Sequence, residues 1–185
     1  MNETLKSIQD RGAKGVSVLG DGHVDAFKAR DVLGLLAAIF VCELAGVVGS
    51  IFTTPAIPTW YASLKKPSFN PPSWVFAPVW LTLYALMGIS LLMVWRKSLG
   101  RPEAKRAMGL FGAQLALNVL WSVTFFGMQS PLYGFFVIVL LWVAVLATMA
   151  VFYRISKGAG ILLLPYFLWG SFASVLNLSI LILNP

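Results

Sequence analysis

Charged residues are scarce in this sequence, and their scarcity excludes most classes of soluble protein. Only 11% of the 185 residues are charged and 58% are hydrophobic, and the mean hydropathy is +0.81. Soluble domains typically carry about 25% charged residues. The composition therefore indicates a membrane protein. No cleavable signal peptide is expected, because the first 30 residues are polar and the first apolar run is long enough to span a bilayer.

Cysteine and histidine occur once each, which leaves little chemistry that depends on them. Cys42 lies inside an apolar run and has no partner for an intrachain disulfide. His23 is alone in the polar N-terminal segment, so we expect neither a metal site nor a haem ligand. The net charge of +7 does not indicate a nucleic-acid partner, because the basic residues lie in short segments between apolar runs, where membrane topology explains them.

Long apolar runs are abundant, and five of them are long enough to cross a bilayer as helices. About 20 predominantly apolar residues suffice for one crossing. The predicted spans are residues 32–53, 74–95, 107–127, 132–153 and 160–183. None shows the alternation of a barrel strand. We therefore expect an all-α membrane protein, a five-transmembrane-helix bundle over residues 32–185, with a polar, mobile tail at residues 1–31.

The basic residues give this bundle a direction. Five spans place the N-terminal tail, the loop at 96–106 and the turn at 154–157 on one side, and these segments hold twelve of the 14 lysine and arginine residues. Lys65 and Lys66 are on the other side. Because cytoplasmic loops are enriched in lysine and arginine, we expect the N-terminus in the cytoplasm and the C-terminus outside.

Seven tryptophans form the most unusual part of the composition. Trp74 and Trp95 end the second span, where indoles commonly anchor a helix at the lipid–water interface. Trp142 has no polar companions on its helix, which indicates packing or lipid contact. The remaining indoles within spans share helix faces with polar or small residues. These stripes are Trp80 with Tyr84, Gln114 with Asn118 and Trp121, and Trp169 with Ala173 and Asn177.

The buried amides of these stripes must face the bundle interior, because an unpaired amide in hydrocarbon is costly. Two explanations are open at this point. The stripes provide hydrogen bonds between helices, or they line a cavity that suits a flat, largely apolar ligand. Glu43, the one ionisable residue deep in a span, is likewise either functional or a structural hydrogen-bonding group.

The segment at residues 59–74 is the densest motif of the chain. Pro67, Pro71 and Pro72 stiffen it. We expect a rigid loop that carries Trp60 and Tyr61 over the outer mouth of the bundle as a lid. Lys65 and Lys66 either meet ligand carboxylates or are solvated or bound to lipid headgroups.

Small residues repeat along two spans and predict close helix approach, inside the bundle or between subunits. In the first span they are Cys42, Gly46 and Ser50. The third-span set is the predicted homodimer seam and comprises Gly109, Gly112, Ala113 and Ala116.

Five sequence blocks, in chain order, resemble the tryptophan-rich sensory protein family, which includes the mitochondrial translocator protein, also called the peripheral benzodiazepine receptor. The blocks are residues 60–67 (WYASLKKP), 71–80 (PPSWVFAPVW), 114–122 (QLALNVLWS), 125–127 (FFG) and 165–177 (PYFLWGSFASVLN). The resemblance covers roughly residues 42–184.

The resemblance implies a five-helix bundle, often homodimeric, whose pocket under the first loop binds porphyrins such as protoporphyrin IX, with no required cofactor. By position, it implies a pocket formed by Trp60, Tyr61, Trp80, Asn118, Trp121, Trp169 and Ala173, to which the stripes add Tyr84 and Asn177. Trp80 and Trp169 match tryptophans implicated in porphyrin photodegradation by some bacterial members.

The resemblance leaves three functions to weigh. The first is a tetrapyrrole-binding sensor or translocator; the second is an enzyme that degrades porphyrin oxidatively or with light through Trp80 and Trp169; the third is a ligand-responsive interaction scaffold. No general base, nucleophile or metal motif supports the enzyme independently. Sterol binding is not expected, because no basic residue follows Leu176 and Asn177. The long charged tail indicates a prokaryotic member, in the cell membrane.

Overall fold

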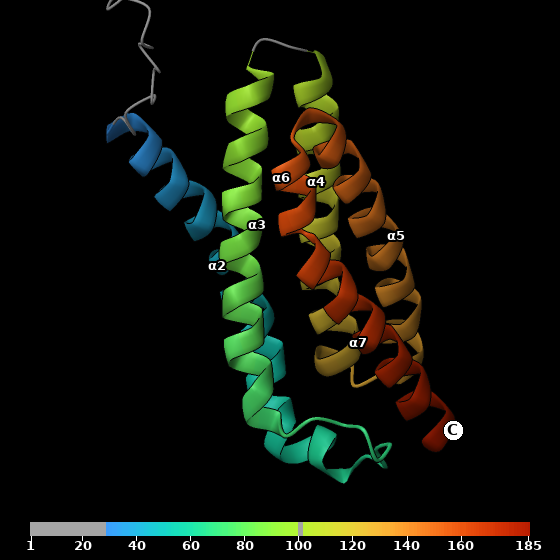
Figure 1. Ribbon diagram of the computed structural model, residues 1–185. Coiled ribbons are helices and arrows are strands. Elements are labelled where there is room, and N and C mark those ends of the chain that lie inside the picture. The colour runs from blue at the N-terminus through green and yellow to red at the C-terminus, as the bar shows by residue number, and fades with distance from the viewer. Residues whose placement is uncertain (1–28, 100–101) are drawn as a thin grey trace, which may run out of the picture. The chain divides into compact units, whose positions relative to one another are not determined.

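The computed structural model describes residues 29–99 and 102–185, and all regular secondary structure in these residues is helical. The prediction of a mobile tail therefore concerns residues that lie almost entirely outside the described ones. The chain divides into two units, Met1–Val32 and Leu33–Pro185, and the packing described below is that of the second. Within the described residues, five helical segments are long and apolar enough to cross a membrane, which confirms the predicted class (Figure 1).

The first span is longer than predicted. Helix α2 (Ala29–Ala56) continues through a π-helical turn, η1 (Ile57–Tyr61), and helical geometry lasts to residue 63. Pro55 and Pro58 have no backbone N–H, and a π turn is one way for a helix to continue past such interruptions. The hydroxyl of Thr59 donates to the carbonyl of Pro55 at 2.8 Å. The predicted end at Thr53 is therefore too early, and Trp60 and Tyr61 lie on a helical extension instead of a loop.

The next three helices match the predicted spans closely. A short 3-10 turn, η2 (Ser73–Val75), leads into α3 (Phe76–Ser98). Helix α4 (Pro102–Ser122) continues into a second π turn, η3 (Val123–Gly127), and α5 (Pro131–Ile155) follows after a sharp turn at Gln129, whose φ is 51°. Ser130 caps α5, since its hydroxyl accepts the backbone N–H of Tyr133 at 3.3 Å.

The fifth span consists of two helices where one was predicted. Helix α6 (Lys157–Leu162) and helix α7 (Leu164–Leu183) meet at Leu163. Pro165 explains the break, because it cannot donate a hydrogen bond to the preceding turn. The N–H of Leu163 donates instead to the carbonyl of Gly160, three residues back, at 3.2 Å. The hydroxyl of Ser90 donates to the carbonyl of Ala159 at 2.8 Å, which fastens α6 to α3.

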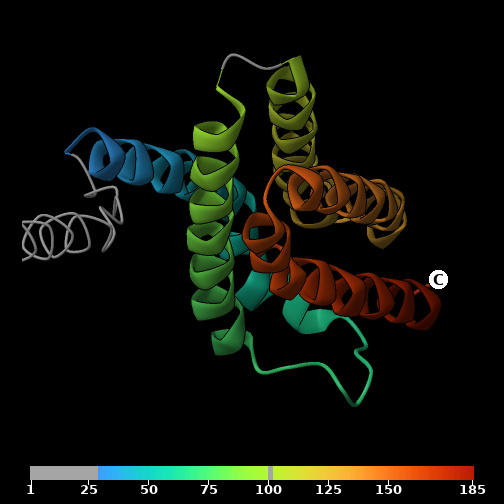
Figure 2. The ribbon, with the colours of Figure 1, turned by 45° about the horizontal axis from the view of Figure 1, so that its top comes forward.

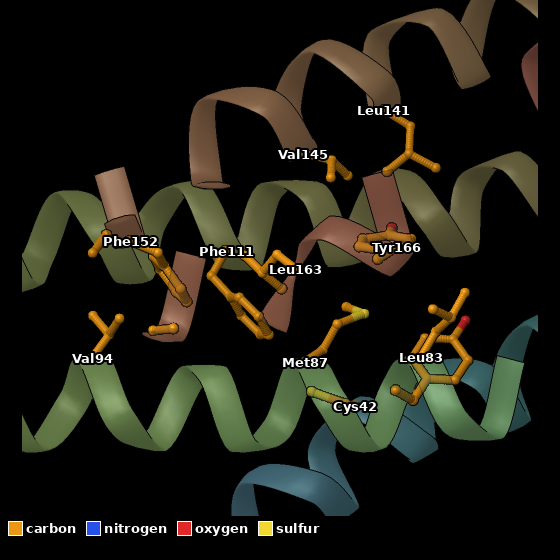
Figure 3. Packing of buried hydrophobic residues seen from close by; sticks show 13 residues of the cluster. Cys42, Leu83, Met87, Val94, Phe111, Leu141, Val145, Phe152, Leu163 and Tyr166 are labelled. Carbon is orange, nitrogen blue, oxygen red and sulfur yellow. The ribbon is translucent and has the colours of Figure 1, made fainter. Parts of the chain in front are cut away.

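The buried core lies between α3, α4, α5 and the two helices of the fifth span, and Figure 3 shows its side chains. Met87, Phe152 and Leu163 are almost fully buried there. The rings of Phe111 and Phe152 stack with a centroid distance of 5.8 Å. Helix association in lipid depends on such packing instead of on exclusion of water, so close contact holds these helices together.

Helix α2 approaches this core along one face only. A Cβ atom on Gly88 of α3 would lie 2.6 Å from the Cα of Ile39, so the two backbones touch at this glycine. On its other side α2 exposes a row of large apolar side chains, which suits contact with lipid. These are Leu33, Leu36, Phe40, Leu44 and Ile51.

The small residues of the two predicted stripes have different surroundings. In the first span Cys42 is fully buried and Gly46 lies against Tyr84, so these two residues allow close packing inside the bundle. In α4 the four residues of the predicted seam are all exposed, and Cβ atoms on Gly109 or Gly112 would meet no atom of the described residues within 4 Å. The α4 face is therefore open, as a contact surface for a second subunit would be.

Candidate ligand pocket

A pocket of about 350 Å³ lies between α2, α3 and α4, and η1 and η3 close one end of it. This volume is within the range of about 300–1,000 Å³ typical of ligand sites. Most of its lining is apolar, and aromatic rings make up a large part. These rings belong to Tyr61, Phe76, Trp80, Tyr84, Trp121 and Phe126. Among the residues that the structure describes, no lysine or arginine lines the pocket.

The pocket is elongated along α2. Glu43, Val47, Ser50 and Thr54 line it and recur every three or four residues, so they form one face of the helix. At 1.5 Å per residue this face is roughly 16 Å long. Because consecutive spans run in opposite directions, Glu43, Tyr84 and Asn118 share one end, which we call the deep end. Tyr61, Ser73 and Phe126 share the other, which we call the loop end.

A hydrogen-bonded chain crosses the bundle at the deep end. The hydroxyl of Tyr84 donates to Oδ1 of Asn118 at 2.6 Å, and Nδ2 of Asn118 donates to the hydroxyl of Tyr166 at 3.0 Å. The chain joins α3, α4 and α7. Asn118 is only 2% exposed, so its amide faces the interior as predicted, and it both links helices and lines the pocket. The sequence left two explanations open for this stripe, hydrogen bonding between helices and lining of a cavity, and both apply to Asn118.

The amide of Asn177 serves structure instead of lining the pocket. Its Oδ1 accepts the indole N–H of Trp121 at 3.2 Å, and its Nδ2 donates to the carbonyl of Pro131 at 2.9 Å. Asn177 therefore fixes the Trp121 ring from the side away from the ligand space. Trp142 is hydrogen-bonded in the same manner, since its indole N–H donates to the hydroxyl of Ser171 at 2.8 Å. Its polar companion lies on another helix, where helical spacing gives no sign of it.

Trp80 and Trp121 separate the pocket from α7. Trp80 stacks on Tyr84 with a centroid distance of 5.4 Å and forms a T-shaped pair with Tyr166 at a centroid distance of 6.2 Å. Behind the two indoles is a void of about 10 Å³, to which Ala173 contributes. Ala173 and Trp169 of α7 thus lie outside the main pocket, and Trp169 packs edge-on against Phe76 at 6.0 Å.

The nine predicted ligand residues consequently fall into two groups. Tyr61, Trp80, Tyr84, Asn118 and Trp121 line the pocket. The others stand behind this lining, and they are Trp60, Trp169, Ala173 and Asn177. Trp60 is next to Tyr61 in the helix, so its side chain points away from the pocket. It packs on Phe125 with a ring-centroid distance of 5.4 Å.

Sequence reasoning missed most of the α2 wall. Gly46 and Gly49 make room for the ring of Tyr84 and the hydroxyl of Ser122, because Cβ atoms there would lie 2.5 Å from Tyr84 Cε2 and 3.0 Å from Ser122 Oγ. The signal was present as the stripe of small residues. Small residues at this spacing predict close helix contact, but a helix with small and hydroxyl side chains opposite aromatic ones can also border a cavity.

The segment at residues 64–72 connects the end of the first span to η2 and α3 and passes beside α7, as Figure 2 shows. The ring of Phe69 packs in a T-shaped pair with the ring of Phe172 of α7, at a centroid distance of 6.2 Å. The hydroxyl of Tyr61 donates to Oδ1 of Asn70 at 2.7 Å. Nζ of Lys66 lies 4.9 Å from the centre of the Tyr61 ring and donates to the carbonyls of Ala62 and Leu64. The predicted lid is thus a segment tied to both α7 and the pocket-lining Tyr61.

The described residues hold no group of three histidine, cysteine, aspartate or glutamate side chains that could bind a metal ion. Trp74 and Trp95 are both exposed, Trp74 to 75%, at opposite ends of the second span. Their exposure leaves both indoles available for the interfacial contact predicted for them.

The helices and the pocket together define a multi-pass α-helical membrane protein with an aromatic intramembrane cavity. Residues 38–183 match the TspO/MBR family, and the chain belongs to this family. It is 47% identical over 156 residues to the "Tryptophan-rich protein TspO" of Chlorobaculum tepidum, covering 84% of this chain and 99% of that protein.

Two further relatives extend the comparison. The "Protein CrtK" of Rhodobacter capsulatus is 41% identical over 154 residues, which cover 83% of this chain and 94% of the relative. The "Translocator protein" of Homo sapiens is 40% identical over 136 residues, which cover 73% and 80%. All five sequence blocks that carried the resemblance lie inside the family match.

Proposed function

We propose that the protein binds a tetrapyrrole such as protoporphyrin IX in this pocket, and that it acts as a membrane sensor or translocator of that ligand. The observation that carries the proposal is the wall of Trp80, Trp121, Phe76 and two tyrosines around a cavity of about 350 Å³. Flat aromatic ligands gain both apolar burial and ring contacts from such a wall. The names of the relatives, sensory protein and translocator protein, accord with the role.

Asn118 supplies the polar group that orients such a ligand. A side-chain amide has two N–H donors and two acceptor sites on oxygen. Tyr84 uses one acceptor site and Tyr166 one donor. One N–H and one lone pair are left for a ligand. The hydrogen bonds to Tyr84 of α3 and Tyr166 of α7 fix the orientation of the amide that carries them. This arrangement favours a ligand with a small number of polar atoms.

The carboxylates of a porphyrin would belong at the loop end. Lys66 lies over the ring of the pocket-lining Tyr61, and no cationic side chain of residues 29–99 or 102–185 lines the pocket itself. Its ammonium group bonds only to backbone carbonyls, so it keeps its charge available to an anion at the mouth.

We further propose that the protein spans the cell membrane of a prokaryote with its N-terminus in the cytoplasm. The ends of α3 and α5 and the start of α4 are basic, whereas Lys65 and Lys66 are alone at the opposite ends. This asymmetry supports an external loop end. The open small-residue face of α4 supports assembly as a homodimer.

Quenching of tryptophan fluorescence by protoporphyrin IX tests the proposal in detergent or nanodiscs. We expect saturable quenching by the wild type and an affinity for Trp80→Phe that is lower by roughly two- to tenfold, the equivalent of about 0.5–1.5 kcal/mol for one aromatic contact. Trp74→Phe is the matched control, because Trp74 is exposed and outside the lining. Quenching that does not saturate, or that both variants weaken equally, would contradict binding in this pocket.

A further inference from the structure

Within the described part of the chain, Glu43 is the one carboxylate in the pocket lining, and it lies at the deep end. It is partly buried, on the α2 face that also carries Gly46 and Val47. Among the described residues, no side chain or backbone group forms a hydrogen bond or ion pair with its carboxyl group. A carboxyl group at this depth in a bilayer is costly without a partner and marks a functional site by default.

Three hydroxyl groups of the pocket lining are already engaged as donors. The hydroxyl of Tyr84 donates to Asn118 at 2.6 Å. Along α2, the hydroxyl of Ser50 donates to the carbonyl of Val47 at 2.7 Å, and that of Thr53 to the carbonyl of Gly49 at 3.1 Å. These groups therefore have no hydrogen atom left for Glu43. An N–H or ammonium group on the occupant of the pocket would supply the donor that these three hydroxyl groups do not give to Glu43.

We propose that Glu43 determines specificity by accepting an N–H or ammonium group of the ligand at the deep end and by repelling carboxylates from it. The inference rests on the proposed function, namely that the pocket binds a flat aromatic ligand. With Glu43 at one end and Lys66 beside the other, the pocket has opposite charges at its two ends. A dianionic porphyrin then binds with its carboxylates toward the loop end. A cationic porphyrin of the same shape binds more tightly than a neutral one, with its ammonium groups toward Glu43.

Three porphyrins with one ring system and different charges test this directly. They are protoporphyrin IX, its neutral dimethyl ester, and its bis(2-aminoethyl) amide, which carries two ammonium groups. We expect the wild type to bind the diammonium compound more tightly than the ester. Glu43→Gln keeps the shape of the side chain and removes its charge. It should weaken the diammonium compound roughly tenfold or more, the value of a charge-assisted hydrogen bond, and leave the ester within about twofold.

For protoporphyrin IX, which carries two carboxylates, we expect Glu43→Gln to change the affinity in the opposite direction. Loss of the repelling carboxylate should leave its affinity for Glu43→Gln unchanged or higher than for the wild type. Glu103→Gln is the matched control, because it removes the same charge from an exposed position near the start of α4, outside the lining. It should alter none of the three affinities. Since the readout is the ratio between ligands within one variant, a general loss of folded protein does not imitate the effect.

The outcomes separate this inference from the proposed function. If all three porphyrins bind saturably and Glu43→Gln leaves their ratios unchanged, Glu43 does not select the ligand, although the pocket still binds tetrapyrroles. Equal ratios in the Glu43→Gln and Glu103→Gln variants would overturn the inference in the same way. If none of the three binds the wild type saturably, the proposed function fails and the inference fails with it.

Discussion

The side chain of Asn184 forms two reciprocal hydrogen bonds with the backbone of Lys65. Its Oδ1 accepts the N–H of Lys65 and its Nδ2 donates to the carbonyl of Lys65, each at 2.9 Å. The same amide also donates to the carbonyl of Ile180 at 2.8 Å. The last turn of α7 thereby holds the segment at residues 64–72 where that segment leaves the first span.

Asn184→Ala should release this segment. The variant loses both bonds to Lys65, and we expect the local opening free energy of residues 64–72 to fall by about 1–2 kcal/mol, the net value of two hydrogen bonds. Hydrogen exchange measured by mass spectrometry should show roughly tenfold faster exchange there, with α4 and α5 unaffected. Ser179→Ala is the control, since that hydroxyl bonds only to Val175 within α7. Equal exchange in the two variants would mean that Asn184 does not hold the segment.

Asn118→Leu should destabilise the whole bundle. It removes the residue that links Tyr84 to Tyr166 and leaves both buried phenols without this partner. Hydrogen bonds between membrane helices average about 0.6 kcal/mol, so the loss of two, together with the stranded hydroxyl groups, should cost about 1–3 kcal/mol. Thermal unfolding in detergent measures the change.

Tyr84→Phe separates these contributions, because it removes one hydroxyl and keeps the ring that stacks on Trp80. It should cost about half as much as Asn118→Leu. A Tyr84→Phe variant that is as unstable as Asn118→Leu would show that the ring environment, and not the hydrogen-bonded chain, is being measured.

Much of this arrangement could be predicted from the sequence, because hydrocarbon imposes strict rules. Helix was the only reasonable spanning form, and an amide such as that of Asn118 or Asn177 had to face inward. Helical spacing also selected the indoles of Trp80 and Trp121, which line the pocket. These inferences needed only the position of each residue on its own helix.

The rest depended on how helices face one another, which spacing within one helix does not contain. Trp169 and Asn177 share an inward face, yet the rings of Trp80 and Trp121 stand between α7 and the pocket. The helical extension to residue 63 was missed because Pro55 and Pro58 ordinarily end a helix, and here a π turn continues it.

Gly46→Ala should reduce ligand binding by moving the ring of Tyr84. The added methyl would lie 2.5 Å from Cε2 of that ring, which has to shift within the pocket or force α2 outward. We expect at least a threefold loss of affinity for protoporphyrin IX, together with a loss of stability of about 1 kcal/mol from overpacking. Gly170→Ala on α7 is the control, because its methyl would meet no described atom within 4 Å and Gly170 lies outside both the main pocket lining and the predicted seam. Undiminished affinity in Gly46→Ala would indicate that the Tyr84 ring does not shape the site.

The exposed small-residue face of α4 should determine the oligomeric state. Gly112→Leu adds a branched side chain where close approach of two helices requires none, so we expect the dimer to dissociate at concentrations at which the wild type is dimeric. Light scattering coupled to size exclusion in mild detergent, with the detergent mass subtracted, gives the protein mass.

Val143→Leu is the control, since it enlarges an exposed residue of α5 away from the seam. The pocket is lined by residues of α4 other than these small ones, so Gly112→Leu should still bind protoporphyrin IX as a monomer. A dimer that tolerates Gly112→Leu but not Val143→Leu would move the seam from α4 to α5.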